Sequence, residues 1–159
     1  MAYDEKTLRW FKFTKPNQAG YCVEVVEDDV IMLPATPLQY LDRWRTHNSI
    51  FRDDVELVGI LQTTEGPRIV VTHADVPGEQ PSWGQIDEMF LSGLRFSKLR
   101  VTGMLGGYEA EAYFGGRIGV FDARPANCVL TSGGLVIPID VIPQFFNRND
   151  ASVLNALRA

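Results

Sequence analysis

Polar side chains near the C-terminal end of the chain have types and spacings that suit phosphoryl transfer. Asp122 is followed by Arg124 after two residues and by Pro125 after three. Asn127 comes five residues after Asp122, and Asp140 comes thirteen residues after Asn127. A carboxylate and an amide oxygen are hard ligands that hold Mg²⁺, while a further carboxylate can accept a proton and a guanidinium can neutralise phosphoryl charge. The pattern therefore predicts a metal and phosphate site.

Short strands would have to position this site. Apolar residues predict a strand over 117–121 and a β-hairpin whose strands cover 128–130 and 135–139. The first acid and the asparagine then lie in the loop before the hairpin, and the hairpin folds Asp140 back beside Asn127.

Each of these residues has an expected role. We expect Asn127 and Asp140 to hold the metal, Asp122 to act as the base and Arg124 to face the phosphoryl group. The alternative is that Asp122 and Asn127 only shape turns, because these side chains readily hydrogen-bond their own backbone.

The first half of the chain is predicted to be mostly strands. Three of them, over 8–13, 21–26 and 30–33, are expected to form an antiparallel meander in which 30–33 is the third strand. A hairpin pairing 55–62 with 68–72 follows. The expected fold class is α+β, with an antiparallel sheet and one helix packed on it.

That helix begins at a capping box. Thr36 precedes Pro37 and Gln39, which predicts a helix running to about Asn48. Its expected apolar stripe is formed by Leu38, Leu41 and Trp44. We expect His47 to be a cap or a packing residue at the end of the helix rather than a catalyst, because a cationic ring suits the dipole there.

Fewer signals mark the second half. Ser82 opens a second capping box and a second amphipathic helix. In the glycine-rich stretch 102–116, Gly103, Gly106 and Gly107 are predicted to form turns rather than a phosphate-binding loop. A terminal helix is expected over 151–157, behind Asn149 or Asp150 as its cap.

Composition limits the class of protein. A chain of 159 residues with 45% hydrophobic and 22% charged residues fits one domain with its own core. The net charge of −5 argues against nucleic acid or an anionic membrane as a partner. Cys22 and Cys128 lack metal-ligand spacing, so we expect buried, reduced thiols. No signal peptide or membrane-spanning run is visible, which favours a cytoplasmic protein.

The stretch DARPANCVL followed by IPIDVI resembles the catalytic loop and metal-binding acid of the protein kinase superfamily. The stretches YLDRWRTHNSIF and VTHADVPG are similar to those of small kinase-like domains in polyvalent proteins of bacterial phages and mobile elements. The resemblance implies a truncated kinase-like core that binds ATP and Mg²⁺. It also implies a small-lobe-like part over 1–73, a hinge-like linker over 74–81 and a reduced large-lobe-like part over 82–159.

The resemblance implies nucleotide-binding residues in the first half as well. Lys12 would substitute for the phosphate-binding lysine, although a solvent-facing strand position is the alternative, and Val71, His73 and Asp75 would lie near the nucleotide at the hinge-like segment.

The family pattern is incomplete. Val-Phe precedes Asp122 where kinases have His-Arg, Val-Ile follows Asp140 where they have Phe-Gly, and no glutamate can be assigned to pair with the lysine. Three functions therefore stay open: a minimal phosphotransferase acting on a hydroxyl, an inactive kinase-like (pseudokinase) module that binds nucleotide, and a protein-interaction module that keeps the core only for its packing.

Overall fold

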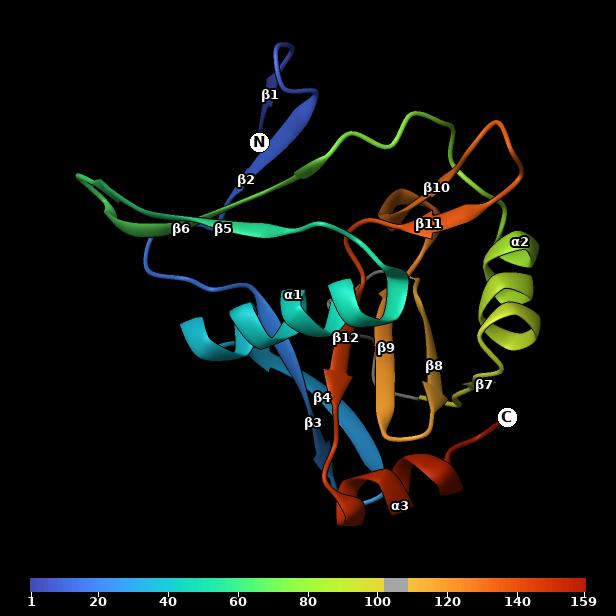
Figure 1. Cartoon of the computed structure of the whole chain (residues 1–159). Coiled ribbons are helices and arrows are strands. Elements are labelled where there is room, and N and C mark those ends of the chain that lie inside the picture. Colours follow the sequence, from blue (N-terminus) through green and yellow to red (C-terminus); the bar gives the residue numbers. More distant parts are fainter. Residues whose placement is uncertain (102–108) are drawn as a thin grey trace. The chain divides into compact units, whose positions relative to one another are not determined.

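The computed structural model describes residues 1–101 and 109–159, and the chain forms two compact units. Unit 1 comprises Met1–Cys22 and Leu33–Asp75, and unit 2 comprises Val23–Met32 and Val76–Ala159. Helices and antiparallel sheets occur together, so the predicted α+β class is confirmed (Figure 1). Within the described residues, no helix is long and apolar enough to cross a membrane.

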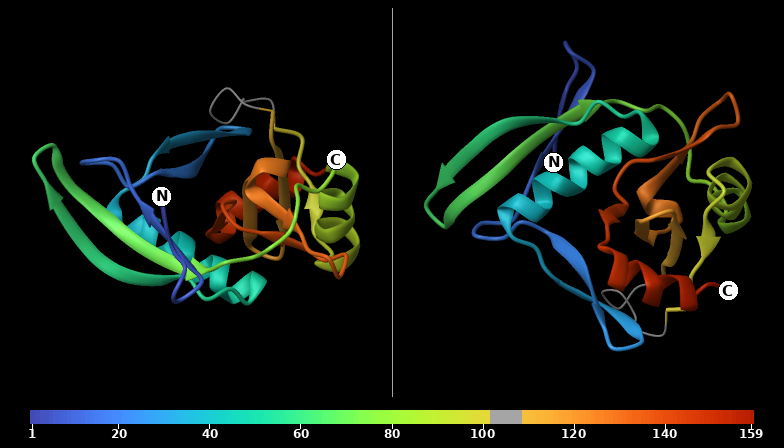
Figure 2. Two further views of the ribbon diagram at one scale, coloured as in Figure 1. Left: turned by 90° about the horizontal axis from the view of Figure 1, so that it is seen from above. Right: turned by 60° about the horizontal axis from the view of Figure 1, so that its bottom comes forward.

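Unit 1 is an antiparallel sheet with a helix on one face. Its main elements are β1 (Ala2–Asp4), β2 (Arg9–Phe13), α1 (Pro37–Phe51), β5 (Glu56–Thr63) and β6 (Gly66–Ala74). The strand order is β1-β2-β6-β5. α1 runs along this sheet, and its Tyr40 and Trp44 pack with Ile69 and Val71 in one buried cluster (Figures 1 and 2).

β2 lies inside this sheet rather than in an N-terminal meander. β3 (Tyr21–Val26) and β4 (Asp29–Pro34) form a separate two-stranded sheet, whereas β2 pairs with β6 and places Lys12 opposite Val71. The predicted meander, with 30–33 as its third strand, is therefore wrong. A solvent-facing Lys12 is wrong as well, since only 9% of this residue is exposed. The physical reason is that most of β6 is buried, so its backbone groups need hydrogen-bond partners from a strand on each side.

The capping box of α1 is confirmed. The side chain of Thr36 accepts from the backbone of Gln39, whose own side chain accepts from Thr36. The helix continues beyond the predicted Asn48 and ends where Arg52 adopts a left-handed conformation with φ 54°. Leu38 is 69% exposed, so the predicted stripe is rotated: the buried residues of the helix are Tyr40, Trp44 and His47.

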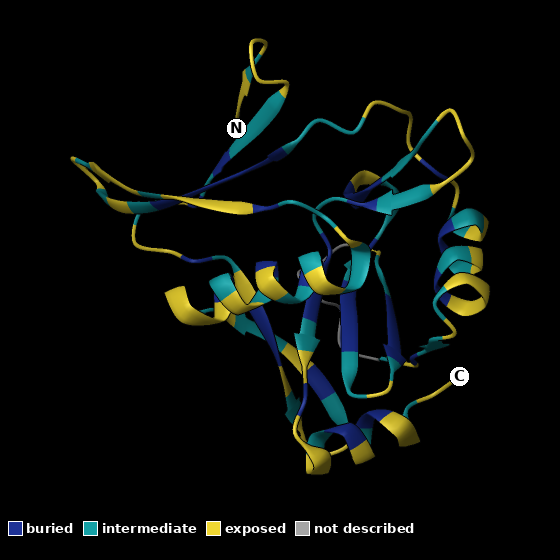
Figure 3. Cartoon of the chain, viewed as in Figure 1, coloured by how far each residue is buried: buried dark blue, intermediate teal, exposed yellow. Residues whose placement is uncertain are grey.

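Unit 2 contains a second antiparallel sheet, of order β12-β9-β8-β7, and a separate hairpin formed by β10 and β11. Its elements are α2 (Trp83–Glu88), a π-helical turn η1 (Met89–Gly93), β7 (Ser97–Lys98), β8 (Glu111–Gly115), β9 (Ile118–Ala123), a 3₁₀ turn η2 (Pro125–Asn127), β10 (Cys128–Leu130), β11 (Val136–Pro138), β12 (Ile142–Phe145) and α3 (Arg148–Ala156). β9 is largely buried, whereas β5 of unit 1 is largely exposed (Figure 3).

Several predictions for unit 2 need correction. Residues 111–115, for which no strand was predicted, form β8, because they pair with β9 and bury Ala112, Tyr113 and Phe114. The glycines within 102–108 lie outside the described residues. α3 begins earlier than predicted, since its cap is Asn147, whose side chain accepts from Asp150.

Candidate functional site

The chain between β9 and β12 brings predicted site residues together in one corner of unit 2. The side-chain nitrogen Nδ2 of Asn127 donates to the backbone oxygen and to Oδ2 of Asp122, each at 2.8 Å. The backbone oxygen of Asn127 accepts from Ile139 at 2.9 Å and from Asp140 at 3.3 Å. The backbones of Asn127 and Asp140 therefore lie side by side, as predicted.

Asp122 was predicted to lie in a loop, but it lies near the end of β9. Its φ of 54° lies in the left-handed region, which aspartate tolerates better than most residues. One carboxylate oxygen accepts from Asn127, and the other lies 3.1 Å from Nε of Arg124. Arg124, which was expected to face a phosphoryl group, thus lies against the carboxylate of Asp122, and Asn127 of the turn η2 supplies its second contact.

The oxygen donors that this corner offers to a metal ion are the side chains of Asn127 and Asp140. Because the nitrogen of the Asn127 amide is used by Asp122, the amide oxygen is the end that can meet a cation. Residues 1–101 and 109–159 contain no group of three or more His, Cys, Asp or Glu side chains that could enclose a metal. Asn127 and Asp140 alone suit Mg²⁺, which usually keeps water and phosphate oxygens as its other ligands.

Cys128 lies directly after Asn127 and is an unreactive neighbour. It is a free thiol, 2% exposed, and burial followed by the charge of Asp122 raises its pKa to about 12. Cys22 is also free and buried. Both thiols are therefore buried and unbridged, as the sequence predicted.

Unit 1 places three predicted nucleotide-binding residues on one face of its sheet. Lys12 is opposite Val71, and the alternation of side chains along β6 puts His73 on the same face as Val71. This is the face that α1 covers, since Nζ of Lys12 lies 4.9 Å from the ring centroid of Trp44. Asp75 instead accepts a hydrogen bond of 2.7 Å from the indole of Trp10.

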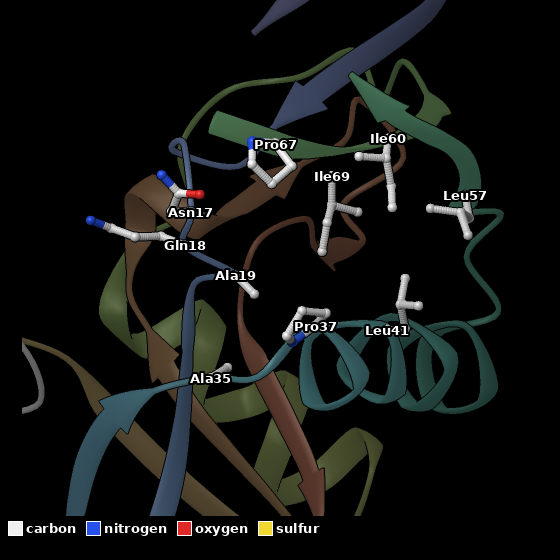
Figure 4. A pocket seen from close by; sticks show the side chains of 10 residues that line it. All are labelled: Asn17, Gln18, Ala19, Ala35, Pro37, Leu41, Leu57, Ile60, Pro67 and Ile69. Atoms are coloured by element: carbon white, nitrogen blue, oxygen red, sulfur yellow. The ribbon is translucent and has the colours of Figure 1, made fainter. Parts of the chain in front are cut away.

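A cavity of about 310 Å³ also lies in unit 1, between α1 and the β5–β6 hairpin (Figure 4). Its apolar walls include Leu41, Leu57, Ile60 and Ile69. A register shift between Leu57 and Gly59 puts Leu57 and Ile60 opposite Val71 and Ile69, and so on the same face although they are three residues apart. Sequence reasoning missed this cavity; the glycine within the apolar run of β5 was the available signal.

Sequence reasoning also missed a contact between a buried histidine of α1 and an acid that follows the helix. His47, predicted as a cap or packing residue, is fully buried, and its Nδ1 lies 3.1 Å from Oδ2 of Asp53. Burial is the main reason that the pKa of His47 is lowered, so the ring is neutral rather than cationic at the end of α1.

The predicted residues of unit 2 thus share one corner, and Lys12, Val71 and His73 share one sheet face of unit 1. These two sets of side chains are the candidates for a functional site. Comparison of the chain with protein-family models, with curated proteins and with solved structures finds no match.

Proposed function

We propose that this chain is an atypical, minimal kinase-like phosphotransferase that binds ATP with Mg²⁺ and transfers the terminal phosphoryl group to a hydroxyl. The observation that carries the proposal is the corner of unit 2, where Asn127 donates to Asp122 and accepts from the backbone of Asp140. In protein kinases an aspartate of the catalytic loop receives the substrate proton, while an asparagine and a later aspartate hold the metal ions. Here Asn127 and Asp140 would hold Mg²⁺, which would neutralise charge on the phosphates when bound.

Asp122 is the proposed base. Its carboxylate is held between Arg124 and Asn127, so it can take the proton of an acceptor hydroxyl in a fixed position. As the new oxygen–phosphorus bond forms, the bond between the terminal phosphoryl group and ADP breaks, and ADP leaves with the electron pair. Arg124 places a positive charge beside this base, where charge on the transferred group develops.

The strand order of unit 1 supports a role for Lys12. The protein-kinase lysine that meets the phosphates stands on a strand of the small-lobe sheet, near a helix. Lys12 stands on β2, which is flanked by β1 and β6, and its side chain lies on the face that α1 covers. Val71 and His73 on the same face are the proposed neighbours of the nucleotide.

The test is transfer or hydrolysis of the labelled terminal phosphate of ATP in the presence of Mg²⁺. Asp140→Asn removes a charged metal ligand and should lower the rate at least about a hundredfold. Asp28→Asn is the matched control, because Asp28 is an exposed aspartate in unit 2 outside the corner, and it should leave the rate unchanged. Equal rates for wild type and Asp140→Asn would contradict the proposal.

A catalytically inactive interaction module is the second candidate, and the exposed strand β5 favours it. β5 is the outer strand of its sheet and carries four large apolar side chains that are about half exposed, namely Leu57, Val58, Ile60 and Leu61. Such an edge suits a partner that adds an extended apolar strand. The cavity beside β5 would receive one of its side chains.

Thermal melting separates the two candidates. A ligand that binds only the native state raises the melting midpoint, so millimolar Mg-ATP should raise it if the nucleotide site is present. No shift with Mg-ATP, together with binding of an apolar dye that Ile60→Asp abolishes, would favour the interaction module. Dye binding that is equal in both proteins would count against it.

A further inference from the structure

A row of buried side chains runs along α1 toward Lys12, and the proposed chemistry does not use it. His47 is 0% exposed, and its ring lies edge-on against Trp44 at 5.3 Å between centroids and against Phe51 at 4.8 Å. Trp44 in turn meets the ammonium group of Lys12. Movement of the His47 ring would therefore reach Lys12 through one intervening indole.

Asp53 supplies the negative charge at the far end of this row. Arg52 ends α1 in a left-handed conformation, and the next residue brings its carboxylate back to His47, with Oδ2 3.1 Å from Nδ1. The Asp53 side chain is only 14% exposed. None of the buried residues of α1 is acidic, and Asp42 of that helix is half exposed and pairs with Arg45.

The electrostatics of His47 and Asp53 agree with a neutral ring beside a charged carboxylate. Burial lowers the pKa of His47 most, Asp53 opposes this shift, and the charges of Arg43 and Lys12 lower the pKa further. Burial raises the pKa of Asp53, but the interactions with His47 and with the backbone of Asp54 outweigh burial, and the net shift is downward.

His73, on the sheet face with Lys12, belongs to the same electrostatic neighbourhood. Burial and then the charge of Lys12 lower its pKa, whereas its backbone partner Ala74 and the charges of Asp53 and Asp54 act in the opposite direction. Its Nδ1 lies 2.9 Å from the Ala74 oxygen, while no described group hydrogen-bonds its buried Nε2. Asp53 and Lys12 thus act on both histidines, with opposite signs.

We propose that Asp53, acting through the ring of His47, positions the sheet face that carries Lys12 and His73 for nucleotide phosphates. The inference rests on the proposed function, because only there is this face a nucleotide site. The buried face of α1 carries no negative charge. Asp53 lies beyond the end of the helix and supplies one. His47 is the neutral link between that charge and the indole of Trp44, over which the ammonium group of Lys12 lies.

Histidine titration by proton NMR tests the electrostatic part directly, because the chain has two histidines in all. Asp53→Asn should lower the pKa of both His47 and His73, because the carboxylate of Asp53 raises both values. Asp42→Asn, the control on the same helix, should change neither. A His73 pKa in Asp53→Asn equal to that of the control would overturn the proposal.

The positioning role has its own readout. Asp53→Asn should weaken Mg-ATP binding roughly tenfold or more, as loss of a supporting residue does at comparable sites, while Asp53→Glu should retain most of the affinity. Lowered histidine pKa values with unchanged affinity would refute the positioning role and leave the proposed function standing. A wild type that binds no Mg-ATP would refute the proposed function, and with it this use of the face.

A second variant covers the case in which Asp53→Asn does not fold. The charge of Lys12 lowers the pKa of both His47 and His73, so Lys12→Met should raise both values. If neither value rises, or only that of His73 does, the two ends of the row are not coupled and the proposal fails.

Discussion

Replacement of Asn127 by alanine should lower the free energy of unfolding, because it removes hydrogen bonds in the corner of unit 2. The side chain donates two hydrogen bonds of 2.8 Å, one to a backbone oxygen and one to the carboxylate of Asp122. A neutral hydrogen bond contributes about 1 kcal/mol and one to a charged group about 2 kcal/mol. Because Asn127 is 5% exposed, water does not readily replace them, and we expect a loss of about 3 kcal/mol.

Urea unfolding followed by tryptophan fluorescence measures this loss, since the chain has three tryptophans. Asn155→Ala is the matched control, because Asn155 is exposed on α3, and it should change the free energy of unfolding by less than about 0.5 kcal/mol. A loss for Asn127→Ala no larger than that of the control would refute the hydrogen-bonding scheme.

Asn127→Asp tests the contact between Asn127 and the Asp122 carboxylate through charge. It keeps the size of the side chain but puts a second carboxylate against Asp122, and like charges raise the folded pKa of such a pair. The variant should therefore be at least as unstable as Asn127→Ala near pH 7 and should recover stability relative to wild type as the pH falls toward 4. Unfolding curves at both pH values that show the same difference from wild type would contradict the scheme.

Two further predictions concern other parts of the chain. Gly78→Ala should cost about 1–3 kcal/mol in the free energy of unfolding, because a Cβ there would collide with the backbone oxygen of Leu130, which also pairs with Glu79; urea unfolding with no loss would contradict it. His47 and His73 both have lowered pKa values, so the native state binds fewer protons than the unfolded state. Stability should be complete above about pH 6.5 and fall below it by up to about 1.4 kcal/mol per pH unit for each histidine, and an unchanged stability between pH 7.5 and pH 5 would contradict this.

Local signals predicted local structure well. The capping box of Thr36 and Gln39 forms within four residues, and the sequence shows all of its parts. The hairpin of β5 and β6 is similar, because one polar turn joins two apolar runs. By contrast, the alternation of side chains in β2 carries no information about which strand lies beside it. Its pairing with β6 depends on tertiary burial, and so did the position of Lys12.

The candidate site shows the same division. Asn127 and Asp140 were expected to meet because a short hairpin separates them. Their backbones are indeed in contact. Packing of His47 was one of two expectations, but its contact with Asp53 could not be predicted. That contact depends on the left-handed Arg52, which turns the chain and brings Asp53 back to the helix.

The most direct test of a metal and nucleotide site uses Mn²⁺ in place of Mg²⁺. If Asn127 and Asp140 supply oxygen ligands, addition of the wild-type protein to Mn-ATP should enhance the relaxation of water protons, because the metal–nucleotide complex then tumbles with the protein. Asp140→Asn should lose most of this enhancement, while Asp28→Asn should keep it. Enhancement that is the same for Asp140→Asn and wild type, or absent from the wild type, would contradict the proposed site.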